Sequence, residues 1–107
     1  MSEIIVQDGG YMAKGIAMQL MQAGYTVKLC EQSELIDTVK ADRPALLILD
    51  AALPDTEIPE MPDTPLLVIV RSRDAYLKTV LQRRGAYCIS TLESVNILPT
   101  VRRILHT

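Results

Sequence analysis

Two aspartates, Asp8 and Asp50, stand where their carboxylates could share a cation. Each follows a short apolar run typical of a buried strand, residues 4–6 and 45–49. Ligands of an open parallel sheet gather beyond the carboxyl ends of its strands, so two adjacent central strands would bring these side chains together. Two unit charges about 4 Å apart repel by about 4 kcal/mol at an effective dielectric of about 20, which favours a shared Mg²⁺ or proton. A carboxylate beside Mg²⁺ can also attack a phosphoryl group and form an acyl phosphate. The alternative is that both aspartates only end their strands and cap the turns that follow.

Apolar runs of strand length alternate with helical periodicity along the chain. The predicted strands are residues 3–6, 26–30, 45–50, 66–70 and 87–90. Four helices are predicted. The first runs from Tyr11 and stops at Gly24, and the second passes through Leu35–Val39 with Ser33 as its N-cap. The third passes through Leu77–Leu81 with Asp74 as its cap and Gly85 after its end, and the fourth starts near Asn96 with Pro99 in its first turn. This alternation predicts parallel strands joined by crossover helices, which is a doubly wound α/β sandwich.

The segment 51–65 interrupts this pattern. It contains Pro54, Pro59, Pro62 and Pro65. Prolines at this spacing leave no room for a multi-turn helix, so a loop with at most one turn is expected. A missing helix would leave a gap on one sheet face that Ile58 and Met61 could fill, and an unfilled apolar groove would be a binding or dimer surface.

Composition limits the class of protein. The 107 residues are 49% apolar and 22% charged, which predicts one globular domain spanning residues 1–107. Only 4% are aromatic, with no Trp or Phe, and the net charge is −2, so nucleic-acid binding is not expected. The apolar runs are far shorter than the roughly 20 residues that span a bilayer, and no signal segment precedes the first predicted strand. We therefore expect a cytoplasmic location and no membrane partner.

Charge is distributed unevenly along the chain. Residues 1–63 carry 11 acidic and 4 basic side chains, whereas residues 64–107 carry 2 acidic and 7 basic ones. Such asymmetry usually concerns partners rather than fold. The candidate interface residues are Arg71, Arg73, Arg83, Arg84, Arg102 and Arg103. They predict association of the 66–105 half with an acidic protein or with a second copy of the chain, and the alternative is an ordinary solvated surface.

Three stretches resemble the receiver domain of bacterial response regulators. They are Ile4–Asp8, Gly24–Val27 and the run RPALLILDAALPD at residues 43–55. The resemblance implies a flavodoxin-like, five-stranded parallel sheet in the order 2-1-3-4-5, here with the third helix missing or very short. In that order Cys30 and Cys88 lie on opposite edges, roughly 19 Å apart, whereas a disulfide needs Cα atoms within about 7 Å.

The resemblance also implies roles for residues near the predicted site. Asp50 matches the phospho-accepting aspartate and Asp8 matches an acid that contacts Mg²⁺. The backbone carbonyl of Ala52 matches the third protein ligand of that ion. Mg²⁺ is thus the one cofactor implied, and a histidine kinase is the implied phosphate donor.

Several receiver positions hold residues that depart from the family pattern. The first of the paired acids falls on Gln7. The switch Ser/Thr falls on Val70, the switch aromatic on Ile89 and the cationic Lys near Leu92. Without that cation a phosphoryl group lacks a fixed positive charge, and without the hydroxyl an acyl phosphate cannot pull on the fourth strand.

Three functions follow as hypotheses. The first is a pseudo-receiver, a non-enzymatic module that regulates an output by dimerisation or partner docking. The second is a receiver that accepts phosphate at Asp50 and switches by a non-standard route. The third is a small phosphotransferase or hydrolase with Asp50 as nucleophile, but Ala52 stands where haloacid-dehalogenase-type phosphatases need a second acid.

Overall fold

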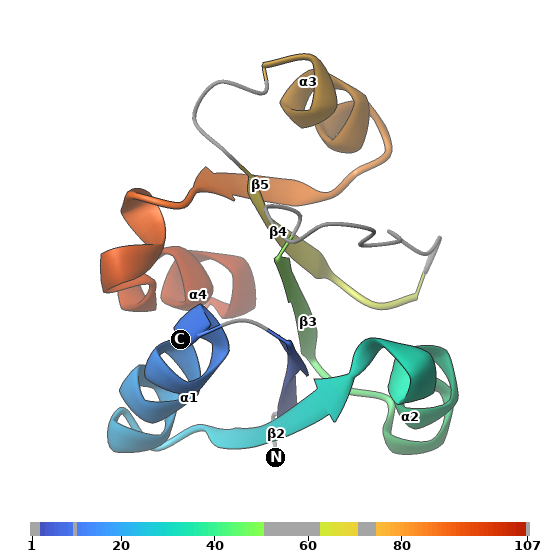
Figure 1. Cartoon of the computed structure of the whole chain (residues 1–107), viewed down its shortest axis with the longest axis vertical. Helices are drawn as coiled ribbons and strands as arrows, with labels where there is room; N and C mark the ends of the chain where they lie inside the picture. Colours follow the sequence, from blue (N-terminus) through green and yellow to red (C-terminus); the bar gives the residue numbers. More distant parts are fainter. Residues whose placement is uncertain (1–2, 10, 51–62, 71–74, 107) are drawn as a thin grey trace.

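Five parallel strands form a single sheet in the computed structural model, which describes residues 3–9, 11–50, 63–70 and 75–106 (Figure 1). The strands are β1 (Glu3–Asp8), β2 (Thr26–Glu31), β3 (Leu46–Asp50), β4 (Leu66–Val70) and β5 (Tyr87–Ser90). Their order is β2-β1-β3-β4-β5, and every neighbouring pair is parallel. The predicted fold class and strand order are confirmed.

Helices cover both faces of the sheet (Figure 1). The α-helices are α1 (Tyr11–Gln22), α2 (Leu35–Asp42), α3 (Ala75–Arg83) and α4 (Leu98–Leu105), and the 3₁₀ turns are η1 (Gln32–Glu34) and η2 (Glu93–Asn96). Residues of α1 and α4 share one apolar cluster with the sheet, whereas α2 and α3 each pack on a separate cluster of the opposite face. The sheet is therefore doubly wound.

The alternation of side chains along β1 shows why the interior of the central strands is almost entirely apolar. Ile4 and Val6 pack in the cluster under α1 and α4, while Ile5 packs in the cluster under α2. A central strand covered on both faces buries every side chain, so it has no polar face.

Backbone conformation marks the helix ends. Gly24 follows α1 with φ +97° and Gly85 follows α3 with φ +85°, as the sequence predicts, because glycine adopts this left-handed conformation without strain. Ser33 lies inside η1, and the N-cap of α2 is Glu34, without a side-chain cap bond. The prediction of Ser33 as a cap is wrong, because a 3₁₀ turn already leads into α2. Pro99 lies in the first turn of α4, as expected.

Some predictions fall on residues outside the described ranges. These are the short third helix, the Ile58 and Met61 plug, the Asp74 cap, the carbonyl of Ala52, and Arg71 and Arg73. The described residues contain four α-helices. None of these helices is long and apolar enough to cross a membrane.

The two cysteines lie in opposite edge strands, as predicted. Cys30 is in β2 and Cys88 is in β5, and both are free thiols. Burial raises the pKa of the Cys88 thiol.

Candidate functional site

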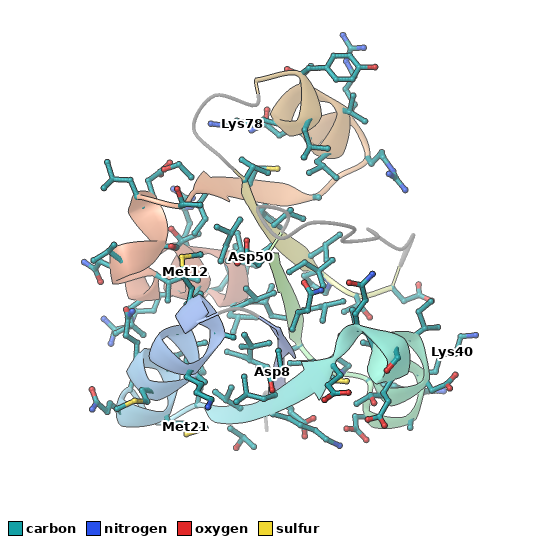
Figure 2. The ribbon with its side chains drawn as sticks, viewed as in Figure 1. Asp8, Met12, Met21, Lys40, Asp50 and Lys78 are labelled. Atoms are coloured by element: carbon teal, nitrogen blue, oxygen red, sulfur yellow. The ribbon has the colours of Figure 1, made fainter. Side chains whose placement is uncertain are left out.

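Asp8 and Asp50 end the neighbouring strands β1 and β3 (Figure 2). The last paired residues of the two strands are Val6 and Ile48, and each aspartate lies two residues beyond its partner in that pair. Side chains two residues apart point to the same face of a strand, so both aspartates belong to the face covered by α1. Both residues are half-buried. The two predicted carboxylates therefore lie at the carboxyl ends of neighbouring central strands and on the same face of the sheet.

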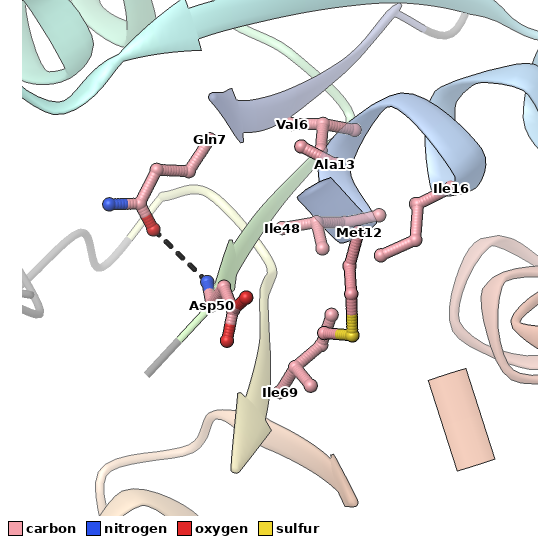
Figure 3. A pocket seen from close by; sticks show the side chains of 8 residues that line it. All are labelled: Val6, Gln7, Met12, Ala13, Ile16, Ile48, Asp50 and Ile69. Atoms are coloured by element: carbon pink, nitrogen blue, oxygen red, sulfur yellow. Dashed lines mark hydrogen bonds between the residues drawn. The ribbon is translucent and has the colours of Figure 1, made fainter. Parts of the chain in front are cut away.

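A buried amide, Gln7, holds the backbone of Asp50. Gln7 is only 2% exposed. Its Oε1 accepts the Asp50 backbone N–H at 3.0 Å (Figure 3). Its Nε2 donates to Oε1 of Gln32 at 3.1 Å. The sequence marks Gln7 as a departure from an acid, but its contact with Asp50 is not foreseen there. The available signal is an amide in a strand whose other interior residues are apolar.

Beside Asp50 lies a small, mostly apolar hollow (Figure 3). Its lining residues are Val6, Gln7, Met12, Ala13, Ile16, Ile48, Asp50 and Ile69. The cavity of about 10 Å³ has room for about one water molecule. A phosphoryl group on Asp50 must therefore project away from this hollow or displace Met12, the half-buried side chain that α1 extends over it.

The switch positions of the resemblance have no polar function in this structure. Val70 and Ile89 are each 2% exposed and pack in apolar clusters. Leu92, near the expected Lys, is 78% exposed. The carbonyl of Val70 accepts the backbone N–H of Thr91 at 3.0 Å, which joins the end of β4 to the turn after β5.

The junction between β5 and α4 is held by side chains that the sequence analysis did not single out. The Glu93 carboxylate accepts the Ser90 backbone N–H, and the Ser90 hydroxyl accepts the Glu93 backbone N–H, both at 3.1 Å. Hydrogen bonding of the carboxylate to Ser90, by its backbone first and its side chain second, holds the pKa of Glu93 below its usual range. The Ser-x-x-Glu spacing is the capping-box signature and could have been recognised.

Gln19 ties α1 to the same junction. Its Nε2 donates to the Val95 carbonyl at 3.1 Å, and its Oε1 accepts the Ile97 backbone N–H at 3.3 Å. These contacts span more than 70 residues of sequence, so no local pattern predicts them.

The four described arginines of the proposed interface are exposed and flank β5 from opposite faces of the sheet. Arg83 ends α3 and Arg84 follows it, while Arg102 and Arg103 lie in the last turn of α4. Because α3 and α4 cover different faces, the four side chains border one sheet edge rather than form one compact patch.

The donor set at the site suits a hard cation. Within the described part of the chain, no three His, Cys, Asp or Glu side chains form a cluster. Asp8 and Asp50 supply two carboxylates from adjacent strands, and Mg²⁺ is usually bound in proteins by one or two carboxylates with several waters. The residues therefore fit Mg²⁺.

Solved structures superimpose on almost the whole chain. The signal receiver domain of a response regulator from Bermanella marisrubri does so with a TM-score of 0.80 at 18% identity, over 98% of this chain and 99% of that one. This chain has the receiver fold. Chemotaxis protein CheY4 of Vibrio cholerae shares it, with a TM-score of 0.75 and 18% identity over 98% of this chain and 99% of that one. A candidate response regulator from Chloroflexus aurantiacus J-10-fl shares the receiver fold with a TM-score of 0.80 at 24% identity, over 99% of this chain and 98% of that one.

Sequence comparisons add no closer relative. No protein-family model matches the chain, and no curated protein matches it. The identities of 18–24% establish the receiver fold alone.

Proposed function

We propose that the chain is an atypical receiver domain of bacterial two-component signalling, which regulates an output by protein association. One observation carries the proposal. Asp50 ends β3, and Val70, which the resemblance aligns with the switch hydroxyl, ends the adjacent β4 and is buried without a hydroxyl.

The physical argument concerns how a phosphoryl group on Asp50 would change the structure of β4 and β5. A hydroxyl at position 70 would hydrogen-bond an acyl phosphate and draw the β4 loop toward it, but Val70 can make only apolar contacts. Leu92 supplies no positive charge for the phosphoryl oxygens, and such fixed charges contribute strongly in a site that excludes water. Retained carboxylates without these partners support a role that does not depend on phosphate.

The proposed mode of action is association through the half formed by residues 66–105. A basic sheet edge bordered by Arg83, Arg84, Arg102 and Arg103 fits an acidic protein or the acidic N-terminal half of a second copy. Complementary charge orients and accelerates such encounters more than it tightens them. In this proposal residues 1–107 form one non-enzymatic cytoplasmic domain, with no nucleic-acid or membrane partner of its own, that acts on an output domain or partner protein.

The alternative function is a phosphorylatable receiver with a histidine kinase as its donor. The observation that favours it is the pair Asp8 and Asp50 at the ends of adjacent strands. Mg²⁺ would be held weakly by Asp8, Asp50 and the backbone carbonyl of Ala52, and it would offset the negative charge of the entering phosphate.

A two-dimensional amide NMR titration with Mg²⁺ and then beryllofluoride, an acyl-phosphate mimic, separates the two functions. The association role predicts that any saturable shifts stay near Asp8 and Asp50, with Val70 and Ile89 unaffected, while sedimentation shows self-association or partner binding without the mimic. Asp50→Asn is the matched control. Shifts that spread along β4 and β5 and vanish in Asp50→Asn would instead support the phosphorylatable receiver.

A further inference from the structure

Gln7 is a buried polar side chain whose amide oxygen and amide nitrogen both form hydrogen bonds inside the protein. Buried polar groups cost free energy unless they are hydrogen-bonded, so a glutamine at 2% exposure needs partners for both its oxygen and its nitrogen. Oxygen Oε1 accepts from the Asp50 backbone, and nitrogen Nε2 donates to Gln32. The amide thereby joins the ends of two central strands to η1, the turn that leads into α2.

The position of Gln32 makes this link specific. Gln32 is the first residue of η1, directly after β2, and it is half-buried. Residues 7, 32 and 50 come from three separate segments, and the bonded pairs are 25 and 43 positions apart in the sequence. Side-chain hydrogen bonds between such distant segments fix tertiary geometry rather than local structure.

We propose that Gln7 and Gln32 are positioning residues for Asp50, and that the neutral amide of Gln7 weakens the affinity of the Asp8–Asp50 pair for a divalent cation. The inference rests on the proposed receiver function, because it concerns the same site. Gln7 orients the backbone that carries the Asp50 carboxylate, and Gln32 restricts the rotation of the Gln7 amide. A carboxylate in place of Gln7 would add one negative charge next to the two aspartates, so the amide keeps the local charge lower.

The variant Gln7→Glu isolates the effect of charge. Glutamate has the same length and keeps an oxygen that can accept the Asp50 N–H. The Gln32 amide can turn to donate its Nε2 instead of accepting, so the carboxylate is satisfied at both ends. We expect Mg²⁺ to bind about tenfold more tightly than to the wild type, because a close negative charge adds attraction. Hydrogen exchange at the Asp50 amide should stay as slow as in the wild type.

Two further variants isolate the positioning effect. Gln7→Leu removes the acceptor at similar size, and Gln32→Ala keeps Gln7 but removes the acceptor of its Nε2. Loss of one hydrogen bond should speed exchange of the Asp50 amide up to about tenfold in Gln7→Leu and less in Gln32→Ala. The exposed Gln82 on α3 gives the matched control Gln82→Ala, which should change neither exchange nor Mg²⁺ affinity.

The test is amide exchange and Mg²⁺ titration by NMR on the full chain, followed at Asp8 and Asp50. Faster Asp50 exchange in Gln32→Ala, with slow exchange and tighter Mg²⁺ binding in Gln7→Glu, supports the inference. It is overturned if Gln32→Ala exchanges like Gln82→Ala, or if Gln7→Glu binds Mg²⁺ no better than the wild type. Gln32→Ala decides the positioning role if Gln7→Leu does not fold. The exchange readout does not involve phosphate, so it can succeed where the beryllofluoride experiment fails.

Discussion

Ser90 and Glu93 hydrogen-bond each other twice, each through its side chain to the backbone N–H of the other. The pair closes the turn between β5 and the 3₁₀ turn η2. Leu92, the residue nearest the expected position of the Lys, lies within this turn and is exposed. Two backbone donors that a helical end would otherwise leave unpaired are satisfied by this arrangement. The β5–η2 turn is therefore fixed by its own side chains and does not depend on a bound phosphoryl group for its order.

This cap predicts a pH-dependent stability. Its hydrogen bonds lower the pKa of Glu93 in the folded state, so its contribution is full above the unfolded pKa of about 4.3 and is lost as the pH falls. Replacing Ser90 by Ala should cost about 0.5–1 kcal/mol at about pH 7. The stability difference between wild type and Glu93→Ala should shrink toward about pH 3. Urea unfolding at both pH values measures it, with the exposed Asp63 replaced by Ala as control, and an equal difference at both would contradict the assignment.

The fold could be predicted because its signals are local. Apolar runs such as Leu46–Asp50 define strands, and Gly24 and Gly85 mark helix ends through a conformation that other residues avoid. The prediction for Ser33 fails because hydroxyl-bearing residues favour N-caps in general, and no sequence signal marks the 3₁₀ turn that contains Ser33.

The candidate site could be predicted only in part. Asp8 and Asp50 are found because each ends an apolar run, and the parallel order brings such ends together. The contact between Gln7 and Asp50 depends on side chains 43 residues apart, which no periodicity encodes. The contacts of Gln19 with Val95 and Ile97 could not be predicted for the same reason.

Met12 predicts a steric limit on the site. If a phosphoryl mimic must compete with this side chain for space, Met12→Ala should bind beryllofluoride more tightly while losing about 1–3 kcal/mol of stability, less than a fully buried methionine. Met21→Ala, at an exposed position of the same helix, is the control. Calorimetric titration and urea unfolding measure the two effects. Unchanged beryllofluoride affinity in Met12→Ala would show that the group projects away from the hollow.

Val70→Thr tests whether a missing hydroxyl breaks the route from Asp50 to β4. Threonine matches valine in shape, but a buried hydroxyl without a partner costs about 1–3 kcal/mol. Val70 packs in the cluster under α3, so its replacement hydroxyl can reach a group on Asp50 only if the end of β4 shifts, and beryllofluoride should then shift amide resonances along β4 and β5 in Val70→Thr. Val68→Thr, in the same cluster but further from the end of β4, has a similar cost and should show no such shifts. Identical spectra for the two variants on titration would reject the explanation.

The arginines predict salt-dependent association. Raising the ionic strength from about 0.1 M to about 1 M shortens the Debye length from about 10 Å to about 3 Å, so contacts between exposed charges weaken. Self-association or partner binding, measured by sedimentation, should weaken in high salt and in the double variant Arg102→Glu with Arg103→Glu. The double variant Lys14→Glu with Lys40→Glu, at exposed positions of α1 and α2, makes the same change in net charge and is the control. Association that ignores both salt and the arginine variant would place the contact elsewhere.

The two faces of the sheet are filled in different ways. Among the residues that the structure describes, one continuous cluster lies under α1 and α4, whereas the other face has one cluster under α2 and another under α3, with Leu66 packed against both. A helix whose apolar contacts end within its own cluster can open locally while the rest of the domain stays folded. Amino-acid substitutions in residues 75–86 can therefore accumulate during evolution, or be introduced in an engineered protein, without repacking the separate core that holds β1 and β3, and with them Asp8 and Asp50, in register.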